Sequence, residues 1–216
     1  LVNAEIIKKP YKHTLFQLFS KELCDQLIKN FYQINKYLNS KKGLSQSRFM
    51  LDVEGDTVNG INYINMEFLK NIEPLNSVLQ MYSDKLIKEQ YEKYYEPKKN
   101  LRFTLQLVYD KKNYSIGPHT DSFKRAATQI TYIVCEEDIN KKLGVSMYKD
   151  LIDRHKEKWD KKHYSFDGFK KVKQVEYYPG SSINFKVKPT SFHGVEKINV
   201  DCNRMSIQTI IWKDDY

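Results

Sequence analysis

The sequence changes period at Leu101-Arg-Phe-Thr-Leu-Gln-Leu-Val-Tyr109, where apolar and polar residues begin to alternate. The alternation returns in Thr128-Gln-Ile-Thr-Tyr-Ile-Val134, and both stretches are rich in β-branched and aromatic residues. A period of two is typical of β-strands whose faces meet different surroundings. The two stretches therefore predict strands in the second half of the chain.

More strand-like runs follow, and turn residues such as Gly117-Pro118, Pro179-Gly180 and Pro189 separate the strands. These further runs are Val145–Tyr148, Val172–Tyr178, Ser182–Val187 and Met205–Trp212. Most are not separated by helical patterns, which favours antiparallel pairing. We expect an α+β, mainly β fold, in which the strands form a sandwich or barrel.

The first hundred residues favour helices. Ser20 is a plausible N-cap, and Lys41–Gly43 would end the helix that it starts. Pro74 fits the first turn of a second helix, which Pro97 would stop. Each helix has an apolar stripe at steps of three and four residues: Leu23, Leu27, Phe31, Ile34 and Leu38 in the first, and Leu75, Val78, Leu79, Tyr82 and Leu86 in the second. Between them, Ser47–Tyr63 is expected to be a loop with at most a short hairpin.

At 216 residues the chain is expected to be one domain, 1–216. In this interpretation, residues 1–100 are a helical support packed on the outer face of a β core formed by residues 101–216. The highly charged stretch Lys149–Lys171 is expected to be a partly helical insertion between strands, and a lid.

Composition narrows the class of protein. The net charge of +9 comes from lysines spread along the whole chain, which favours a compositional bias over a dedicated polyanion site. No window approaches 18 consecutive apolar residues, so no membrane span is expected, and Leu1–Lys12 lacks the pattern of a signal peptide. The three cysteines lie far apart without a CxxC motif, which argues against a disulfide framework or zinc cluster and suggests a reducing, cytoplasmic location.

The chemistry is expected at two distant places. His119-Thr120-Asp121 lies in a strand region, where residues i and i+2 point to the same side, so His119 and Asp121 can reach one metal ion. His193 stands where a later strand should end, just past Pro189. Two imidazoles and one carboxylate leave coordination positions open, as in non-haem Fe(II) sites, whereas a structural zinc site fills its positions with protein ligands.

A dicarboxylate bound to the metal at one end would present its other carboxylate to a cation, and Arg204 follows His193 at the start of the last strand. A guanidinium buried in a barrel is costly unless an anion meets it, and it can bind a carboxylate in a bidentate manner. Tyr109 and Ser206 could donate hydroxyls to the same anion. The simpler alternative is that Arg204 forms a salt bridge with Asp201 or Glu196.

The ordered set His119-x-Asp121, His193 and Arg204-x-Ser206 resembles the Fe(II)/2-oxoglutarate-dependent dioxygenases, most closely their prolyl-4-hydroxylase-like branch. The flanking segments support the resemblance: Gln106–Tyr109, Thr131–Val134, Gly144–Tyr148, Tyr178–Phe185 and Ser191–Val195. It covers residues 101–213 apart from the insertion. It implies a double-stranded β-helix, or jelly-roll barrel, with N-terminal helices on its outer face.

The resemblance also implies roles and a reaction. His119, Asp121 and His193 would bind Fe(II), Arg204 would bind the distal carboxylate of 2-oxoglutarate, and Tyr109 and Ser206 would assist. Such a hydroxylase uses O2, releases succinate and CO2, and oxidises a substrate, here a peptidyl side chain, an amino acid, or a sugar or lipid precursor. Two features depart from the common pattern and leave the substrate open: the insertion, which matches no known substrate loop, and the basic residues Lys124 and Arg125 near the mouth of the barrel.

Two other functions stay open at this point. The positive charge would suit oxidative demethylation of nucleic acid, although the second arginine typical of such enzymes does not follow Arg204. The chain could also be a catalytically silent binding module of the same fold, which the complete ligand set argues against. The sequence does not determine the oligomeric state. His13, His155 and His163 lack a comparable context and are expected to be structural or solvated.

Overall fold

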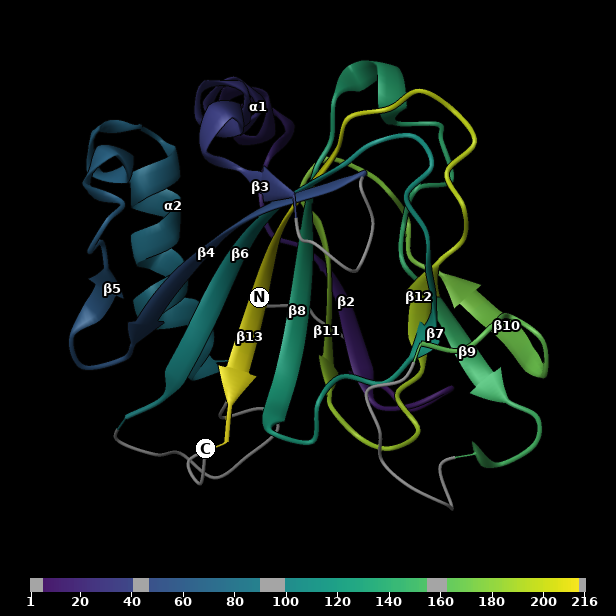
Figure 1. Cartoon of the computed structure of the whole chain (residues 1–216). Helices are drawn as coiled ribbons and strands as arrows, with labels where there is room; N and C mark the ends of the chain where they lie inside the picture. Colours follow the sequence, from purple (N-terminus) through teal and green to yellow (C-terminus); the bar gives the residue numbers. More distant parts are fainter. Residues whose placement is uncertain (1–5, 41–46, 90–99, 155–162, 214–216) are drawn as a thin grey trace.

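The computed structural model describes residues 6–40, 47–89, 100–154 and 163–213, whose strands form two antiparallel sheets (Figure 1). The larger sheet has the strand order β1 (Ile6–Ile7), β2 (His13–Gln17), β11 (Ser181–Lys186), β8 (Arg125–Ile133), β13 (Arg204–Trp212), β6 (Arg102–Asp110), β4 (Arg48–Asp56) and β3 (Asn39–Ser40), and β5 (Gly60–Asn62) pairs with β4. The smaller sheet has the order β10 (Phe169–Gln174), β9 (Ser146–Asp150), β12 (His193–Val195) and β7 (Ile116–His119).

All six predicted strands are confirmed, as β6, β8, β9, β10, β11 and β13, with shifts of a few residues at their ends. The mainly β, antiparallel fold class is therefore confirmed. The described strands form two sheets that face each other, and hydrogen bonds do not join these sheets into one closed ring. Strands β7 and β12 were not predicted, because each is short and their pairing is irregular.

The central strands β6, β8 and β13 are buried on both faces. Residues on the two faces of this sheet belong to two different cores. One core lies between the larger sheet and the helices and includes Leu105, Leu107 and Ile207. The other lies between the two sheets and includes Ile130 and Tyr132. Side chains of the second set point toward the space between the sheets, where a site can form.

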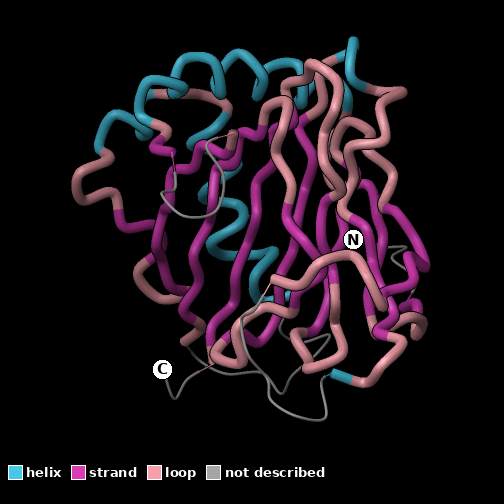
Figure 2. The backbone as a smooth tube through the Cα atoms, turned by 45° about the vertical axis from the view of Figure 1, so that its right-hand side comes forward, coloured by secondary structure: helices cyan, strands magenta, loops and turns pink. Residues whose placement is uncertain are grey.

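Two helices cover the outer face of the larger sheet, as predicted (Figures 1 and 2). Helix α1 (Lys21–Ile34) begins at the predicted cap, where Ser20 Oγ accepts a hydrogen bond from Leu23 N at 3.2 Å. Helix α2 (Leu75–Met81) continues into a π-helical turn, Tyr82–Leu86. The Tyr82 hydroxyl donates to Thr131 Oγ1 of β8 at 2.6 Å, which fixes this helix on the sheet. None of the described helices is long and apolar enough to cross a membrane.

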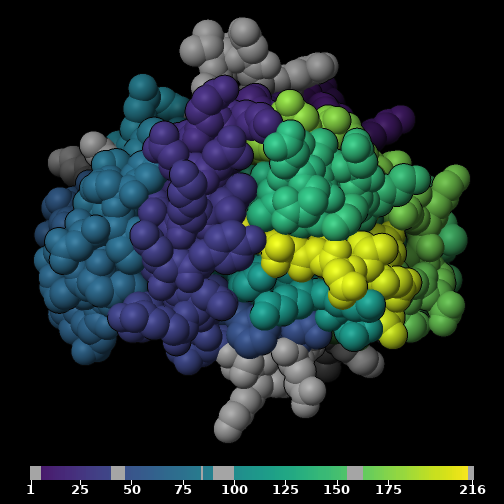
Figure 3. Space-filling model, turned by 90° about the horizontal axis from the view of Figure 1, so that it is seen from above, coloured from purple at the N-terminus to yellow at the C-terminus, as the bar shows by residue number. Residues whose placement is uncertain are grey.

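Seen from above, α1 lies at the surface between the α2 region and the loops that follow β8 and precede β13 (Figure 3). The helix is shorter than predicted, since it gives way at Asn35–Tyr37 to a 3-10 turn before Lys41–Gly43 is reached. Two other short 3-10 turns cover Glu67–Asn71 and Glu136–Asp138. The predicted stop at Pro97 lies outside the described residues.

The expectation that residues 1–100 are mainly a helical support was wrong. Strands β1 to β5 come from this half, and β2 and β4 pair directly with β11 and β6 of the second half. Ser47–Tyr63, expected to be a loop with at most a short hairpin, does contain a hairpin, but its first strand, β4, is nine residues long and continues into the larger sheet. Polar residues near the sheet edge and the turn residues of the hairpin hid this strand, because an edge region is only half buried.

The insertion expected at Lys149–Lys171 is in part a hairpin. Strands β9 and β10 pair from Phe169 with Asp150 onward, and residues 163–168 return the chain toward β10. Residues 155–162, where the predicted helix would lie, are outside the described residues. Strands β9 and β10 thus belong to the smaller sheet, and the returning segment contacts β7 at the other edge of this sheet, where Tyr164 N donates to the Pro118 carbonyl.

Candidate functional site

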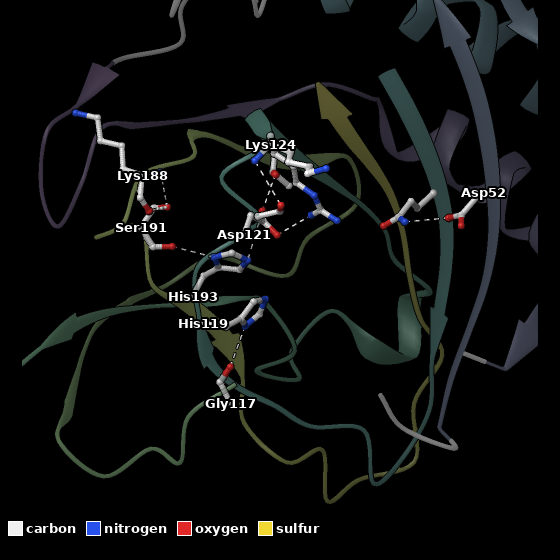
Figure 4. A network of polar contacts seen from close by, with 12 residues as sticks. Asp52, Gly117, His119, Asp121, Lys124, Lys188, Ser191 and His193 are labelled. Carbon is white, nitrogen blue, oxygen red and sulfur yellow. Dashed lines mark hydrogen bonds and ion pairs between the residues drawn. The ribbon is translucent and has the colours of Figure 1, made fainter. Parts of the chain in front are cut away.

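The three predicted metal ligands come together between the two sheets. His119 ends β7 and His193 begins β12, and the two are directly paired across these strands. Asp121 follows two residues after His119, and one ligand atom from each of the three lies within 4.8 Å of the others. All three side chains are buried, and Figure 4 shows them pointing toward one another.

Both imidazoles are oriented by the backbone. His119 Nδ1 lies 2.9 Å from the carbonyl oxygen of Gly117, and His193 Nδ1 lies 3.0 Å from that of Ser191 (Figure 4). A carbonyl oxygen accepts only, so each Nδ1 carries the proton and donates it. Each Nε2 is then left with a free electron pair, and this is the tautomer that binds metal ions.

The Asp121 carboxylate is held from two sides. Arg125 Nη1 lies 2.6 Å from Oδ1, and the Thr128 hydroxyl donates to Oδ2 at 2.6 Å. Oδ2 also lies 3.9 Å from His193 Nε2. These donors fix the carboxylate so that one of its oxygens faces the imidazoles.

The electrostatics favour a neutral His119 imidazole and an ionised Asp121 carboxylate. Burial, followed by the neighbouring His193, lowers the pKa of His119 to about 3. Burial by itself would raise the pKa of Asp121, but Arg125 and the two imidazoles together lower it below its usual value. His119 and Asp121 thus present electron pairs at neutral pH. Two imidazoles with one carboxylate are the donor set of non-haem Fe(II) sites.

The cluster opens into a cavity of about 210 Å³ between the sheets. His163 and Trp212 line it together with the ligands, and Arg48, Tyr114 and Arg204 line it as well. Apolar residues such as Ile116, Ile130 and Val195 complete the wall. A small acid with one metal-binding end and one charged end matches this combination of ligands, apolar wall and cations.

Arg204 lies in the cavity wall but is already paired, with a partner that the sequence did not suggest. Its Nη1 contacts Asp110 Oδ2, and its Nε donates to the Leu143 carbonyl at 2.6 Å. Asp110 is fully buried and also binds Arg48, at 2.6 Å from Nε and 2.8 Å from Nη2. The alternatives Asp201 and Glu196 are therefore replaced by Asp110, directly opposite Arg204 in the pairing of β13 with β6.

The two expected helper residues lie on different faces of the sheet. Tyr109 pairs with Met205, so it shares the face of Met205 and not that of Arg204. It packs in the core under the helices, and its hydroxyl donates to Asn203 Oδ1. Tyr109 therefore does not line the cavity, and the expectation that it helps to bind the anion was wrong. Ser206 is buried on the same face of β13 as Arg204, as the alternation predicts.

Four residues of the site were missed. Arg48 and Tyr114 come from segments expected to be loop or unassigned, and no local pattern marks them. His163, expected to be solvated or structural, lies with its ring 4.6 Å from that of His119. Arg125 had been noted near the mouth, but its bond to Asp121 was not foreseen. The signal available for Arg125 was a basic residue four positions after Asp121.

The remaining predicted features are structural. His13 is fully buried, with Nδ1 2.8 Å from the Tyr11 carbonyl, and does not line the cavity, while His155 lies outside the described residues. The cysteines Cys24, Cys135 and Cys202 are all free thiols, as expected.

No protein-family model and no curated protein matches this sequence. Solved structures do resemble the fold. A prolyl hydroxylase from Trichoplax adhaerens, in complex with a hypoxia inducible factor peptide fragment, is 10% identical over 94% of this chain and 84% of that chain, with a TM-score of 0.53. HygX from Streptomyces hygroscopicus, with nickel, 2-oxoglutarate and hygromycin B bound, is 10% identical with the same coverage and a TM-score of 0.58.

A third similar structure is SnoK, a non-haem alpha ketoglutarate dependent carbocyclase from nogalamycin biosynthesis. It is 11% identical over 93% of this chain and 79% of that chain, with a TM-score of 0.59. Because identities near 10% establish the fold alone, we take the resemblance deduced from the sequence as confirmed at that level. This chain has the double-stranded β-helix fold of the Fe/2-oxoglutarate-dependent oxygenases.

Proposed function

We propose that the protein is an Fe(II)- and 2-oxoglutarate-dependent oxygenase that hydroxylates a small-molecule or peptidyl substrate. The observation that supports this most is the cluster of His119, Asp121 and His193, whose ligand atoms lie within 4.8 Å of one another. Two imidazoles and one carboxylate form a facial set of ligands, which suits a metal that must also bind a co-substrate.

Different residues of the chain would have different roles. His119, Asp121 and His193 would hold the metal, and Arg125 and Thr128 would keep Asp121 oriented. The guanidinium groups of the cavity wall would attract the second carboxylate of the keto acid. When bound, iron with 2-oxoglutarate and O2 supplies the oxidising chemistry, with release of succinate and CO2. The cavity wall would keep bulk water from the reacting atoms.

We propose either a small molecule or a peptidyl side chain as the substrate. Among the similar structures, one holds hygromycin B and another holds a peptide fragment. The described cavity of about 210 Å³ accommodates a keto acid beside the ligands, so the substrate would approach from the mouth near His163 and Trp212.

The test is anaerobic titration of the protein with Fe(II) and 2-oxoglutarate, followed by visible absorption. We expect a weak charge-transfer band in the wild type. His119→Ala, Asp121→Ala and His193→Ala should lose it, because removing a direct ligand should weaken metal binding at least about 100-fold, more than losing an outer-shell partner does. Asp25→Ala, on the exposed side of α1, is the matched control and should retain the band.

The same titration separates an enzyme from a silent module. With O2 admitted, the wild type should release succinate and the three ligand variants should not. A wild type that shows neither the band nor succinate would contradict the proposed function and favour a binding module.

A further inference from the structure

Arg48, Asp110, Arg204 and Tyr114 form a buried group at the inner wall of the cavity. Arg204 is 1% exposed and is engaged with the Leu143 carbonyl and with Asp110, while its guanidinium lies 5.5 Å from the centre of the Tyr132 ring. Its Nε and Nη1 thus serve groups of the protein itself. A ligand carboxylate that bound Arg204 through either atom would compete with the Leu143 carbonyl or with Asp110.

Arg48 is placed differently. Its Nε and Nη2 bind the two oxygens of Asp110, and for Nη1 the described part of the chain provides no hydrogen-bond acceptor. Both arginines line the cavity, and Arg48 is the more exposed of the two, at 8% against 1% for Arg204. Two guanidiniums and one carboxylate give this group a net charge of +1, which favours an anion beside it.

Tyr114 provides a second, independent indication. Its side chain is 1% exposed, and its hydroxyl is buried with no hydrogen-bond partner among the described residues. The Arg48 guanidinium lies over its ring, 4.2 Å from the ring centre, and both residues line the cavity. Burial raises the pKa of the Tyr114 hydroxyl well above 10, so it stays protonated and can donate. A buried hydroxyl without a partner is costly, and a bound anion would remove that cost.

We propose that Arg48 and Tyr114 are the residues that contact the distal carboxylate of the keto acid, and that Arg204 is a positioning residue that holds Asp110 and, through it, Arg48. This inference rests on the proposed function. The cation that contacts the carboxylate would then be Arg48 of β4, in the N-terminal half of the chain, and not Arg204 of β13.

The experiment compares two keto acids that differ at one end. 2-Oxovalerate has the carbon chain of 2-oxoglutarate but a methyl group in place of the distal carboxylate. Binding of each to the Fe(II) protein is measured anaerobically from the visible band, for the wild type, Tyr114→Phe and Arg48→Gln. Tyr114→Phe removes one oxygen and keeps the ring under Arg48, so it tests the proposal even if Arg48→Gln does not fold.

We expect Tyr114→Phe to weaken 2-oxoglutarate binding about tenfold, and Arg48→Gln to weaken it at least as much, since each removes a donor to a charged group. Binding of 2-oxovalerate should change less than twofold in Tyr114→Phe. Wild-type affinity for 2-oxoglutarate in both variants, or equal weakening for both keto acids, would overturn the inference alone. A wild type that binds Fe(II) but neither keto acid would overturn the proposed function as well.

Discussion

Both histidines of the metal cluster are oriented in the same local way. In each case the ring Nδ1 donates to the carbonyl two residues earlier, at Gly117 or Ser191. The bond turns Nε2 toward the partner ligands without help from a distant residue. Ligand orientation is therefore a property of two short segments, although the contact between these segments is not.

Asp110 is the residue on which the buried charges depend, and this leads to a prediction. Asp110→Asn would leave Arg48 and Arg204 buried with a neutral partner. Removing one partner of a buried ion pair costs about 3–5 kcal/mol, so we expect the free energy of unfolding to fall by that amount. Urea unfolding followed by circular dichroism measures it.

Asp52→Asn is the matched control for Asp110→Asn. Asp52 is exposed and accepts a hydrogen bond from Gln106 at 2.9 Å, so its substitution should change the free energy of unfolding by less than about 0.5 kcal/mol. Equal effects of the two substitutions would show that the buried Asp110 contributes no more to the free energy of unfolding than the exposed Asp52 does.

At the scale of elements, the site depends on how the segment after residue 162 returns to β7. Tyr164 N donates to the Pro118 carbonyl at 3.0 Å, and the Tyr164 ring packs 5.8 Å from the ring of Phe169. A Cβ at Gly117 would lie 1.9 Å from the Tyr164 carbonyl oxygen, so only glycine permits this approach. The contact brings His163 beside His119 at the mouth of the cavity.

Gly117→Ala should therefore push the return segment away from β7. We expect the free energy of unfolding to fall by about 1–3 kcal/mol, as in other overpacked sites, because the clash is with backbone. Limited proteolysis with mass spectrometry should show faster cleavage between His163 and Lys171.

Gly60→Ala provides the comparison for Gly117→Ala. Gly60 has a φ of +76°, and a Cβ there would meet only Gln80 Oε1 at 3.9 Å, an ordinary contact, so its substitution should cost stability through backbone strain alone. The cleavage rate between His163 and Lys171 should then stay at the wild-type value. An unchanged cleavage rate in Gly117→Ala would contradict the packing argument.

At the scale of the whole molecule, the two sheets make different contributions to the cavity. The smaller sheet and its flanking residues supply the candidate metal ligands, and the larger sheet supplies Arg48, Asp110 and Arg204. The helices stay on the outer face and contribute to the core behind the larger sheet. The site therefore requires the complete pair of sheets.

The stability of the whole molecule should depend on His13, which is fully buried on β2. Burial lowers the pKa of His13 below 6.5, more than the Tyr11 carbonyl raises it, and Lys173 lowers it further. The unfolded chain then binds more protons below pH 6.5 than the folded one does. Stability is thus complete above pH 6.5 and falls as the pH decreases below it.

We expect the difference in unfolding free energy between wild type and His13→Gln to shrink by at most about 1.4 kcal/mol per pH unit below 6.5. Urea unfolding at pH 7.5, 6.5 and 5.5, with chelator present throughout, measures it. The chelator keeps the other histidines metal-free in both proteins, so their titration cancels in the difference. A difference that is constant with pH would show that His13 does not titrate differently on folding.

Much of the fold could be predicted from local patterns. The period-two stretches gave β6, β8 and β13, and the apolar stripes and Ser20 gave the two helices. Strand β4 could not be found this way, because its partner β6 is distant in the sequence and its polar residues suit a half-buried position near the sheet edge. The residue pattern within one strand says little about a partner strand that is distant in the sequence.

The sequence by itself determined the antiparallel, mainly β architecture and the identity of the His119, Asp121 and His193 cluster. Residue spacing along a strand sets which side chains share a face, and this property is local. Only the tertiary structure decided that Asp110 pairs with Arg204, that Tyr109 faces the helices, and that Arg48 and Tyr114 reach the cavity. These facts depend on strand register and on segments brought together from far apart, which a pattern within one segment cannot specify.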